Sequence, residues 1–228
     1  MFTPSLALKQ SNILITGASS GIGRATVETF LSEGCTVHGI DILPSPWPNN
    51  TIRYSHHECD VRDTSLPHID EVAAIVHCAG VQDSDDDIGV NLKGTINIMN
   101  KYALENPHLM SVVTMASVSA HNSAEFPEYV ASKGGVLAYT RWLAKTLAPQ
   151  QVTVNSISFG GVLTDLNQQV IENTDKFQQI MEMTPLRKWA TPEECADWIY
   201  FLVVCNKSMT AQDLIIDNGE MCNHTFVW

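Results

Sequence analysis

Short hydrophobic runs alternate with stretches of helical periodicity along most of the chain. Residues 12–16 form a β-rich run that stops at a glycine, as a buried parallel strand would. Apolar residues then recur at helical spacing over 22–31, and residues 35–40 predict a second strand, closed by Asp41. A strand, a glycine turn, a helix and a second strand make up the βαβ unit of a parallel sheet.

The alternation continues after one interruption. Residues 43–50 hold three prolines and predict a loop. Further strands are predicted over 52–56, 73–77, 111–115, 152–157 and 214–216, and a long helix over 129–147. The pattern predicts a single α/β domain, residues 1–228, with a doubly wound Rossmann fold: a mostly parallel, seven-stranded sheet with helices on both faces.

Two helix starts carry capping signals. Ser84 is predicted to cap one helix, with Asp85–Asp87 at the positive end of its dipole. The run Thr191-Pro192-Glu193-Glu194 combines a capping residue, a first-turn proline and acidic residues. The acidic run 83–87 is therefore explained by a helix start, and it lacks the spacing and glycine of a calcium loop.

Composition narrows the class of protein. Hydrophobic residues make up 44% and charged residues 17%, enough apolar material for one core. The formal net charge of −12 argues against nucleic acid or an anionic membrane as a partner, because both demand a basic face. No apolar run is long enough to span a bilayer, and residues 1–10 lack the features of a signal peptide. The six cysteines form no CxxC pair, so we expect reduced thiols and a cytoplasmic protein.

A glycine-rich turn, residues 16–23 with the sequence TGASSGIG, joins the first strand to the first helix. Glycines there let peptide N–H groups approach a pyrophosphate at the helix N-terminus. The turn follows a strand, opens a helix and precedes an acidic residue, which favours a dinucleotide site over a turn without a ligand. The Asp41 carboxylate would bind the ribose hydroxyls of NAD and repel the 2′-phosphate of NADP, and Ile42 offers that phosphate no charge. We therefore expect NAD(H) in preference to NADP(H).

Tyr129 and Lys133 are four residues apart and share one face of the predicted helix. An unperturbed tyrosine has a pKa of about 10, too high to exchange protons readily near pH 7, and a neighbouring ammonium group lowers such a pKa. A shift of about 3 units needs roughly 4 kcal/mol, which a lysine and a positive nicotinamide ring can supply. A tyrosine and a lysine on a helix surface would explain the spacing equally well on its own.

Over nearly its whole length the chain resembles the short-chain dehydrogenase/reductase family, in its short single-domain branch that includes members acting on 3-oxoacyl thioesters and on alcohols. The matching segments, in chain order, are the turn at 16–23, Asp60-Val61, Cys78-Ala79-Gly80, Val90-Asn91-Leu92, Ser117 ahead of Tyr129 and Lys133, and Val154-Asn155 leading to Gly160, Val162 and Thr164. The resemblance implies hydride transfer between NAD(H) and a small alcohol or ketone. It also implies a homodimer or homotetramer.

The resemblance further implies a catalytic tetrad. Tyr129 would act as general acid or base on the substrate oxygen, and Ser117 would orient that oxygen. Lys133 would lower the tyrosine pKa and hold the nicotinamide ribose, while Asn91 would anchor a water between Lys133 and solvent. Ser119 is a rival for the serine role, but Ser117 lies at the end of the predicted strand and matches the family better.

The same resemblance assigns residues to the cofactor. Asp60 and Val61 would meet the adenine, Ala79 and Gly80 the ribose and pyrophosphate side, and the residues after Gly160 the carboxamide. The full implied set is Gly17, Ser19, Ser20, Gly21, Ile22, Gly23, Asp41, Ile42, Asp60, Val61, Cys78, Ala79, Gly80, Tyr129, Lys133, Gly160, Val162 and Thr164.

The chain departs from the family pattern at three places. Phe159 replaces the usual proline before Gly160, which is expected to loosen the loop on the nicotinamide side. The stretch 41–80 is short, so at least one peripheral helix is expected to be reduced or missing. Only ten residues separate Gly80 from Asn91, which predicts a more open substrate entrance or one completed by a second subunit.

The substrate itself is poorly determined by the sequence. Residues 163–190 are expected to form a lid. Its Met181, Met183, Pro185 and Trp189 would either wrap an apolar substrate or only pack the lid onto the body. His121 and Phe126 are candidates for facing the substrate. The tail, residues 220–228 with Phe226 and Trp228, is expected to be buried at a subunit interface.

Other functions fit the sequence less well. The run 56–60 contains metal-ligand types, but neighbouring strand residues point to opposite faces and no zinc spacing is present, so no metal is expected. A sugar-nucleotide epimerase would need a different glycine turn and a larger C-terminal region. The main alternative is an NAD(H)-binding sensor or scaffold with little turnover.

Overall fold

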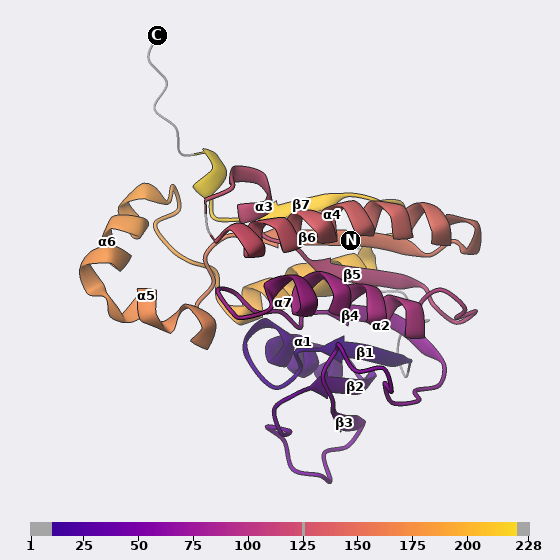
Figure 1. Cartoon of the computed structure of the whole chain (residues 1–228). Coiled ribbons are helices and arrows are strands. Elements are labelled where there is room, and N and C mark those ends of the chain that lie inside the picture. The colour runs from indigo at the N-terminus through magenta and orange to yellow at the C-terminus, as the bar shows by residue number, and fades with distance from the viewer. Residues whose placement is uncertain (1–10, 125, 223–228) are drawn as a thin grey trace.

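The computed structural model describes residues 11–124 and 126–222, which form a three-layer α/β structure around one parallel sheet (Figure 1). The seven strands run in the order β3-β2-β1-β4-β5-β6-β7 and pair in parallel throughout. Their bounds are β1 (Asn12–Thr16), β2 (Thr36–Asp41), β3 (Tyr54–Glu58), β4 (Val72–His77), β5 (Ser111–Met115), β6 (Thr153–Phe159) and β7 (Asp213–Ile216). The predicted Rossmann fold is confirmed, and each predicted strand lies within two residues of its expected place.

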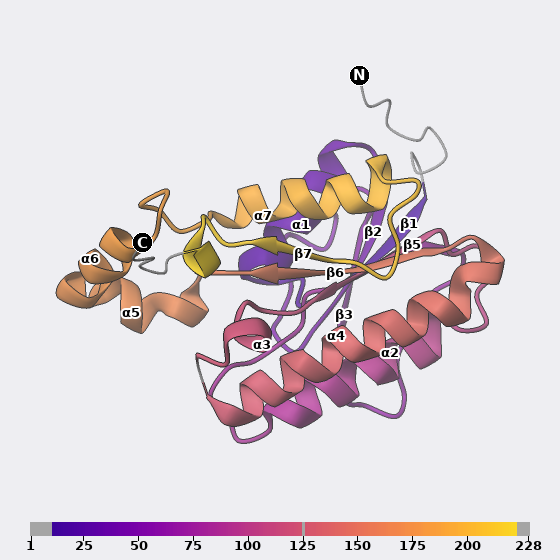
Figure 2. The same cartoon turned by 90° about the horizontal axis from the view of Figure 1, so that it is seen from above.

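Helices cover both faces of the sheet (Figure 2). On one face lie α1 (Gly21–Ser32) and α7 (Pro192–Tyr200), and on the other lie α2 (Gly94–Tyr102) and α4 (Pro127–Leu147). Alternate residues of β1 serve the two layers, because side chains of a strand point to opposite faces. Ile13 and Ile15 pack in the first layer with Phe30 of α1, whereas Leu14 packs in the second with Leu143 of α4.

The prediction that a peripheral helix is missing from the short stretch 41–80 is confirmed. Residues 59–71, between β3 and β4, contain only turns and bends. Here Val61, Leu66 and Ile69 fold back onto the second core layer, so a plain loop covers apolar surface that would otherwise need a helix.

The helix predicted to start near Ser84 is present, but its regular part starts further along the chain. A π-helical segment, η2 (Ile88–Lys93), begins four residues later and runs directly into α2. The Ser84 hydroxyl donates to Asp87 Oδ1 at 2.7 Å, and Asp86 Oδ1 accepts from the Gly89 N–H at 2.8 Å. Ser84 Oγ also accepts from the Asp86 N–H at 3.3 Å, so the serine and the carboxylates together serve the N–H groups at this helix start. The helix start predicted at Thr191 is confirmed as the start of α7, where Thr191 and Glu194 also form a capping box.

Phe159 does not loosen the chain at its own position. It is the last residue of β6, paired with Ile216 of β7, and its carbonyl accepts from the Val118 N–H at 3.2 Å. Its ring is buried in the first core layer. Unlike proline, phenylalanine leaves the strand free to continue to this residue, so the loop begins at Gly160.

A lid projects beyond the sheet at the end toward which β6 and β7 point (Figures 1 and 2). It contains α5 (Gln168–Glu172) and α6 (Thr174–Met183), and α6 has no buried residue. An isolated bridge between Val162 and Ala190 joins the two ends of the lid. Nothing in the described ranges is a helix long and apolar enough to cross a membrane. Phe226 and Trp228 lie outside the described residues.

Candidate cofactor and substrate site

The glycine turn after β1 leaves its backbone uncovered by side chains. Gly17 has φ +65°, and a Cβ there would lie 2.8 Å from the Ala79 nitrogen. A Cβ on Gly23 would lie 2.0 Å from the Gly17 carbonyl oxygen. These positions therefore require glycine, and the turn is held directly against the end of β4 and the start of α1, as an anion-binding helix N-terminus requires.

Asp41 ends β2 beside this turn. Its Oδ2 accepts from the Ser19 N–H at 2.9 Å and its Oδ1 accepts from the Leu43 N–H at 2.9 Å. The side chain is buried yet borders an open cavity. Each carboxylate oxygen keeps a further lone pair, so the group is fixed in orientation and can still accept from a ligand hydroxyl.

That cavity has a volume of about 710 Å³ and contains most of the expected cofactor residues. The ones that line it are Gly17, Ser20, Gly21, Ile22, Gly23, Asp41, Ile42, Asp60, Val61, Cys78, Ala79, Gly80 and Thr164. Ser19 does not line the cavity, but its N–H donates to the Asp41 carboxylate, which does line it. Burial raises the pKa of the Cys78 thiol to about 12, so this wall of the cavity is uncharged.

Asp60 has a partner that the sequence did not reveal. Arg62 donates from Nη2 to Asp60 Oδ2 at 2.7 Å and from Nη1 to Asp86 Oδ2 at 3.0 Å. The hydrogen bond from Arg62 holds the pKa of the Asp60 carboxyl below its ordinary value. The arginine thereby ties two loops together across one end of the cavity.

Tyr129 and Lys133 project from the first turns of α4 and are both buried. Lys133 Nζ donates to the Met115 carbonyl at 3.0 Å and lies 5.6 Å from the centre of the Tyr129 ring. Burial lowers the pKa of Lys133 to about 8, because a desolvated ammonium ion is disfavoured. The two residues therefore form a buried pair, and the surface alternative for their spacing is excluded.

Asn91 lies beneath Lys133 in the π-helical segment. Its Nδ2 donates to the Val81 carbonyl at 2.8 Å and to Ser132 Oγ at 3.0 Å, and its Oδ1 accepts from the Val81 N–H at 2.8 Å. A Cβ on Gly80 would lie 3.1 Å from Asn91 Oδ1 and 3.3 Å from Lys133 Nζ. The asparagine side chain thus fixes the loop after β4 against α4.

A second cleft, of about 1020 Å³, adjoins the first cavity and shares Ile22, Cys78, Gly80 and Thr164 with it. The expected residues that line it are Ser117, Tyr129, Lys133, Gly160 and Val162. The structure therefore brings three tetrad residues to one cleft, with Asn91 behind them.

Both candidate serines border this cleft. Ser117 Oγ donates to Ser119 Oγ at 3.1 Å and accepts from the Ser119 N–H at 3.2 Å. Ser119 therefore positions Ser117, and the geometry does not separate them by access to the cleft.

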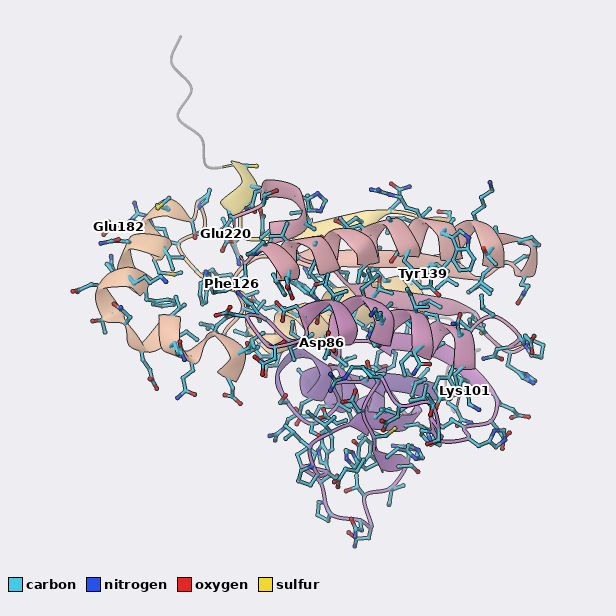
Figure 3. All side chains as sticks on the ribbon, viewed as in Figure 1. Asp86, Lys101, Phe126, Tyr139, Glu182 and Glu220 are labelled. Carbon is cyan, nitrogen blue, oxygen red and sulfur yellow. The ribbon has the colours of Figure 1, made fainter. Side chains whose placement is uncertain are left out.

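Of the two candidates for substrate contact, Phe126 lines the cleft and His121 does not. Phe126 lines the cleft, and Figure 3 shows it at the edge of the body nearest the lid. His121 does not line it, since its Nε2 lies 2.8 Å from Asp213 Oδ2 and 3.1 Å from Ser158 Oγ. The acidic residue at the start of β7 thus holds the imidazole away from the site.

Some of the apolar lid residues face the cleft, and others only pack the lid in place. Met183 borders the cleft and is 65% exposed. Trp189 also borders it but is 8% exposed, with its ring 5.2 Å from that of Phe177 on α6. Met181 and Pro185 do not line the cleft. A Cβ on Gly161 would lie 2.0 Å from the Trp189 ring, so Trp189 packs α6 onto the loop after β6, while Met183 is open to a ligand.

Several residues of the site carried no sequence signal. The Met115 carbonyl that accepts from Lys133 is a backbone group of unremarkable identity. Glu220 accepts from the Gly161 N–H at 3.1 Å with Oε1, fixing the loop after β6 from the far end of the chain. Arg62 is the exception. It lies two residues from Asp60, and a nearby charge of opposite sign could have suggested an ion pair from the sequence.

Comparisons with known proteins cover almost the whole chain. A family model described as enoyl-(acyl carrier protein) reductase matches residues 17–220. The 3-oxoacyl-(acyl-carrier-protein) reductase of Thermotoga maritima is 29% identical over an alignment that covers 90% of this chain and 96% of that protein. The (3R)-3-hydroxyacyl-CoA dehydrogenase of Homo sapiens is 29% identical over an alignment that covers 86% of this chain and 89% of that protein.

The fold is shared with solved structures to a similar extent. A structure of 4-hydroxyisoleucine dehydrogenase complexed with NADH superimposes with a TM-score of 0.83 at 25% identity, covering 94% of this chain and 100% of that chain. The similarity therefore includes both cavities and the lid, and is not confined to the glycine turn.

Proposed function

Since this chain belongs to the short-chain dehydrogenase/reductase family of oxidoreductases, we propose that it transfers hydride between NAD(H) and the carbinol or carbonyl carbon of a small molecule. The observation that carries the proposal is the shared wall of the two cavities. One contains the glycine turn and Asp41, and the other contains Ser117, Tyr129 and Lys133. A dinucleotide in the first would place its reactive end beside the side chains of the second.

The residues present fit a dinucleotide on structural grounds. Glycine is required at positions 17 and 23, where a Cβ would meet neighbouring backbone, so the turn packs closely at the N-terminus of α1, where an anion is favoured. Asp41 is held by two backbone N–H groups with lone pairs to spare. The bound nicotinamide would supply or accept the hydride, and the protein would supply orientation and proton transfer.

Within this proposal Tyr129 moves the proton. During reduction its hydroxyl donates a proton to the carbonyl oxygen as the carbon is reduced, and during oxidation the phenolate takes that proton back. The Ser117 hydroxyl would turn its proton from Ser119 Oγ to the same substrate oxygen, while its own oxygen continues to accept from the Ser119 N–H. The ammonium group of Lys133, 5.6 Å from the tyrosine ring, favours the phenolate.

Asn91 and the proton path complete the proposal. Asn91 Oδ1 accepts from the Val81 N–H at 2.8 Å and keeps a second lone pair for a water. Such a water would connect Lys133 to solvent past Gly80, the residue whose missing side chain leaves both groups uncovered.

Asp41 is the basis for proposing NAD(H) rather than NADP(H). We expect Asp41→Ala to raise the Kd for NADH about tenfold, because the substitution removes one or two hydrogen bonds from the ribose to a charged acceptor. The Kd for NADPH should change far less, because the same substitution removes a repulsive charge. Fluorescence titration of both cofactors measures the ratio of the two Kd values.

Asp197→Ala is the matched control, since Asp197 is exposed on α7 and lines neither cavity. It should leave both Kd values unchanged. An Asp41→Ala variant that keeps its folded circular dichroism and its original preference would remove Asp41 from the explanation.

The test of the proposed function is NADH consumption over a panel of ketones by the purified protein. Turnover that depends on a ketone supports the oxidoreductase. Tight NADH binding with no turnover over the panel would favour the alternative, an NAD(H)-binding sensor, which the short segment between Gly80 and Asn91 suggests.

A further inference from the structure

The substrate cleft is walled by exposed apolar side chains. Phe126 on the body is 41% exposed, and Leu166 and Met183 on the lid are 58% and 65% exposed. All three line the cleft together with Val170 and Ile180. Apolar side chains left open to solvent on both walls indicate a ligand that covers them with apolar surface.

The cleft is also large for a small alcohol. Its volume of about 1020 Å³ lies at the upper end of the range for pockets that bury drug-sized ligands. Even with a nicotinamide ring at the end shared with the first cavity, space remains for a chain of several carbon atoms. A polyol, with an oxygen on each carbon, would leave those of its hydroxyl groups that face the apolar side chains without partners.

Lys176 contributes the one cation on the lid side of this cleft. It lies on α6 with Ile180 and Met183 at the spacing i, i+4, i+7, and all three line the cleft. Its backbone N–H donates to Asn173 Oδ1, so the lysine lies in the first turn of the helix. A cation at that end of a helix opposes the dipole, so local helix stability does not explain its presence.

The charges around Lys176 leave its ammonium group available. Within the described ranges, no carboxylate lies within 4.0 Å of it, whereas Lys188 at the end of the lid pairs with Glu194. Among the residues that the structure describes, two other charged ones line the cleft. Lys133 is buried against the Met115 carbonyl, and Glu220 accepts from the Gly161 N–H.

We propose that the substrate is a ketone or alcohol with an aliphatic segment and an anionic group, and that Lys176 binds the anion from the lid while the apolar walls bind the segment. This inference rests on the proposed function for the position of the reacting carbon. It names a substrate class, and it makes Lys176 the residue that determines specificity for charge.

The test uses methyl ketones with a terminal carboxylate, namely 4-oxopentanoate, 6-oxoheptanoate and 8-oxononanoate, each beside its uncharged methyl ester. With NADH, the wild-type protein should reduce at least one acid with a kcat/KM about tenfold above that of its ester, the size of one charge-assisted hydrogen bond. Fructose, an uncharged polyol ketone, should be reduced less well than that ester. Equal use of acid and ester, or a preference for fructose, would overturn the inference.

Substitution assigns the preference to one side chain. Lys176→Met should abolish the tenfold preference by lowering kcat/KM for the acid and leaving the ester unchanged, and Lys176→Arg should retain it. Lys145→Met, an exposed lysine in the last turn of α4, is the control and should change neither. A preference that survives Lys176→Met would exclude Lys176 as its source.

Binding without chemistry separates this inference from the proposed function. In the presence of NADH, calorimetry should show octanoate binding about tenfold more tightly than uncharged octanamide to the wild-type protein, and equally to Lys176→Met. If no ketone is reduced but octanoate shows this difference, the proposed function fails and the anion site stands. If ketones are reduced but octanoate and octanamide bind alike, the proposed function stands and the anion site at Lys176 fails.

Discussion

Tyr129→Phe is expected to lower kcat for ketone reduction about 1000-fold, because it removes the one hydroxyl proposed to protonate the substrate oxygen. General acid–base groups contribute 10²- to 10⁴-fold to rates. The ring of Tyr129 is buried and would stay in place, so the Kd for NADH should stay within about twofold of wild type. Steady-state kinetics and NADH titration measure the two effects separately.

Tyr139→Phe is a matched control on the same helix. The Tyr139 hydroxyl is buried and has no hydrogen-bond partner in the described part of the chain. Its removal should leave kcat unchanged and cost no stability. A Tyr129→Phe protein that retained a tenth or more of wild-type kcat would show that another group moves the proton.

Lys133→Met is expected to lower kcat about 100-fold and to make the protein more stable at neutral pH. The loss of activity follows from removing the ammonium group that favours the tyrosinate. The gain in stability follows from burial, which lowers the pKa of Lys133 from 10.5 to about 8. A difference of about 2.5 units corresponds to about 3 kcal/mol at pH 7. The Met115 carbonyl loses its donor, which costs about 1 kcal/mol, so the net gain is about 2 kcal/mol.

The pH dependence of this gain has a definite sign. Between pH 8 and 10.5 the unfolded chain binds more protons at Lys133 than the folded chain does, so stability of the wild-type protein rises with pH across that window. The variant lacks this rise. Urea unfolding at pH 7 and pH 9.5 should show the advantage of the variant shrinking by about 2 kcal/mol.

Lys145→Met again provides the control, and its stability should stay within about 0.5 kcal/mol of wild type at both pH values. A Lys133→Met protein that is less stable than wild type at pH 7, by an amount that does not change with pH, would mean that Lys133 is not a desolvated cation.

The features that the sequence predicted well depend on spacing along the chain. The turn 16–23 lies between a strand and a helix, so its role in the fold follows from neighbours a few residues away. Tyr129 and Lys133 share a helix face because they are four residues apart. The absent helix at 59–71 was foreseen because the stretch 41–80 is shorter than in the family that the chain resembles.

The features that were missed depend on contacts between distant segments. Ser84 accepts from the Asp86 N–H as a cap would, but Asp86 accepts from the Gly89 N–H further on, and the regular helical segment begins only at Ile88. His121 looked available to a substrate until Asp213, 92 residues later, was seen to hold it. Phe159 was expected to loosen a loop, and pairing with β7 instead prolongs the strand.

Direct transfer of hydrogen from the cofactor tests the central proposal most closely. The purified protein would be incubated with NADH that carries deuterium at the transferable C4 position and with any ketone that it reduces, and the alcohol would be examined by mass spectrometry and NMR. The account predicts one deuterium on the carbinol carbon and none on the hydroxyl oxygen after exchange with water. Tight NADH binding with no deuterated alcohol from any ketone would contradict it and leave a protein that binds the cofactor without using it.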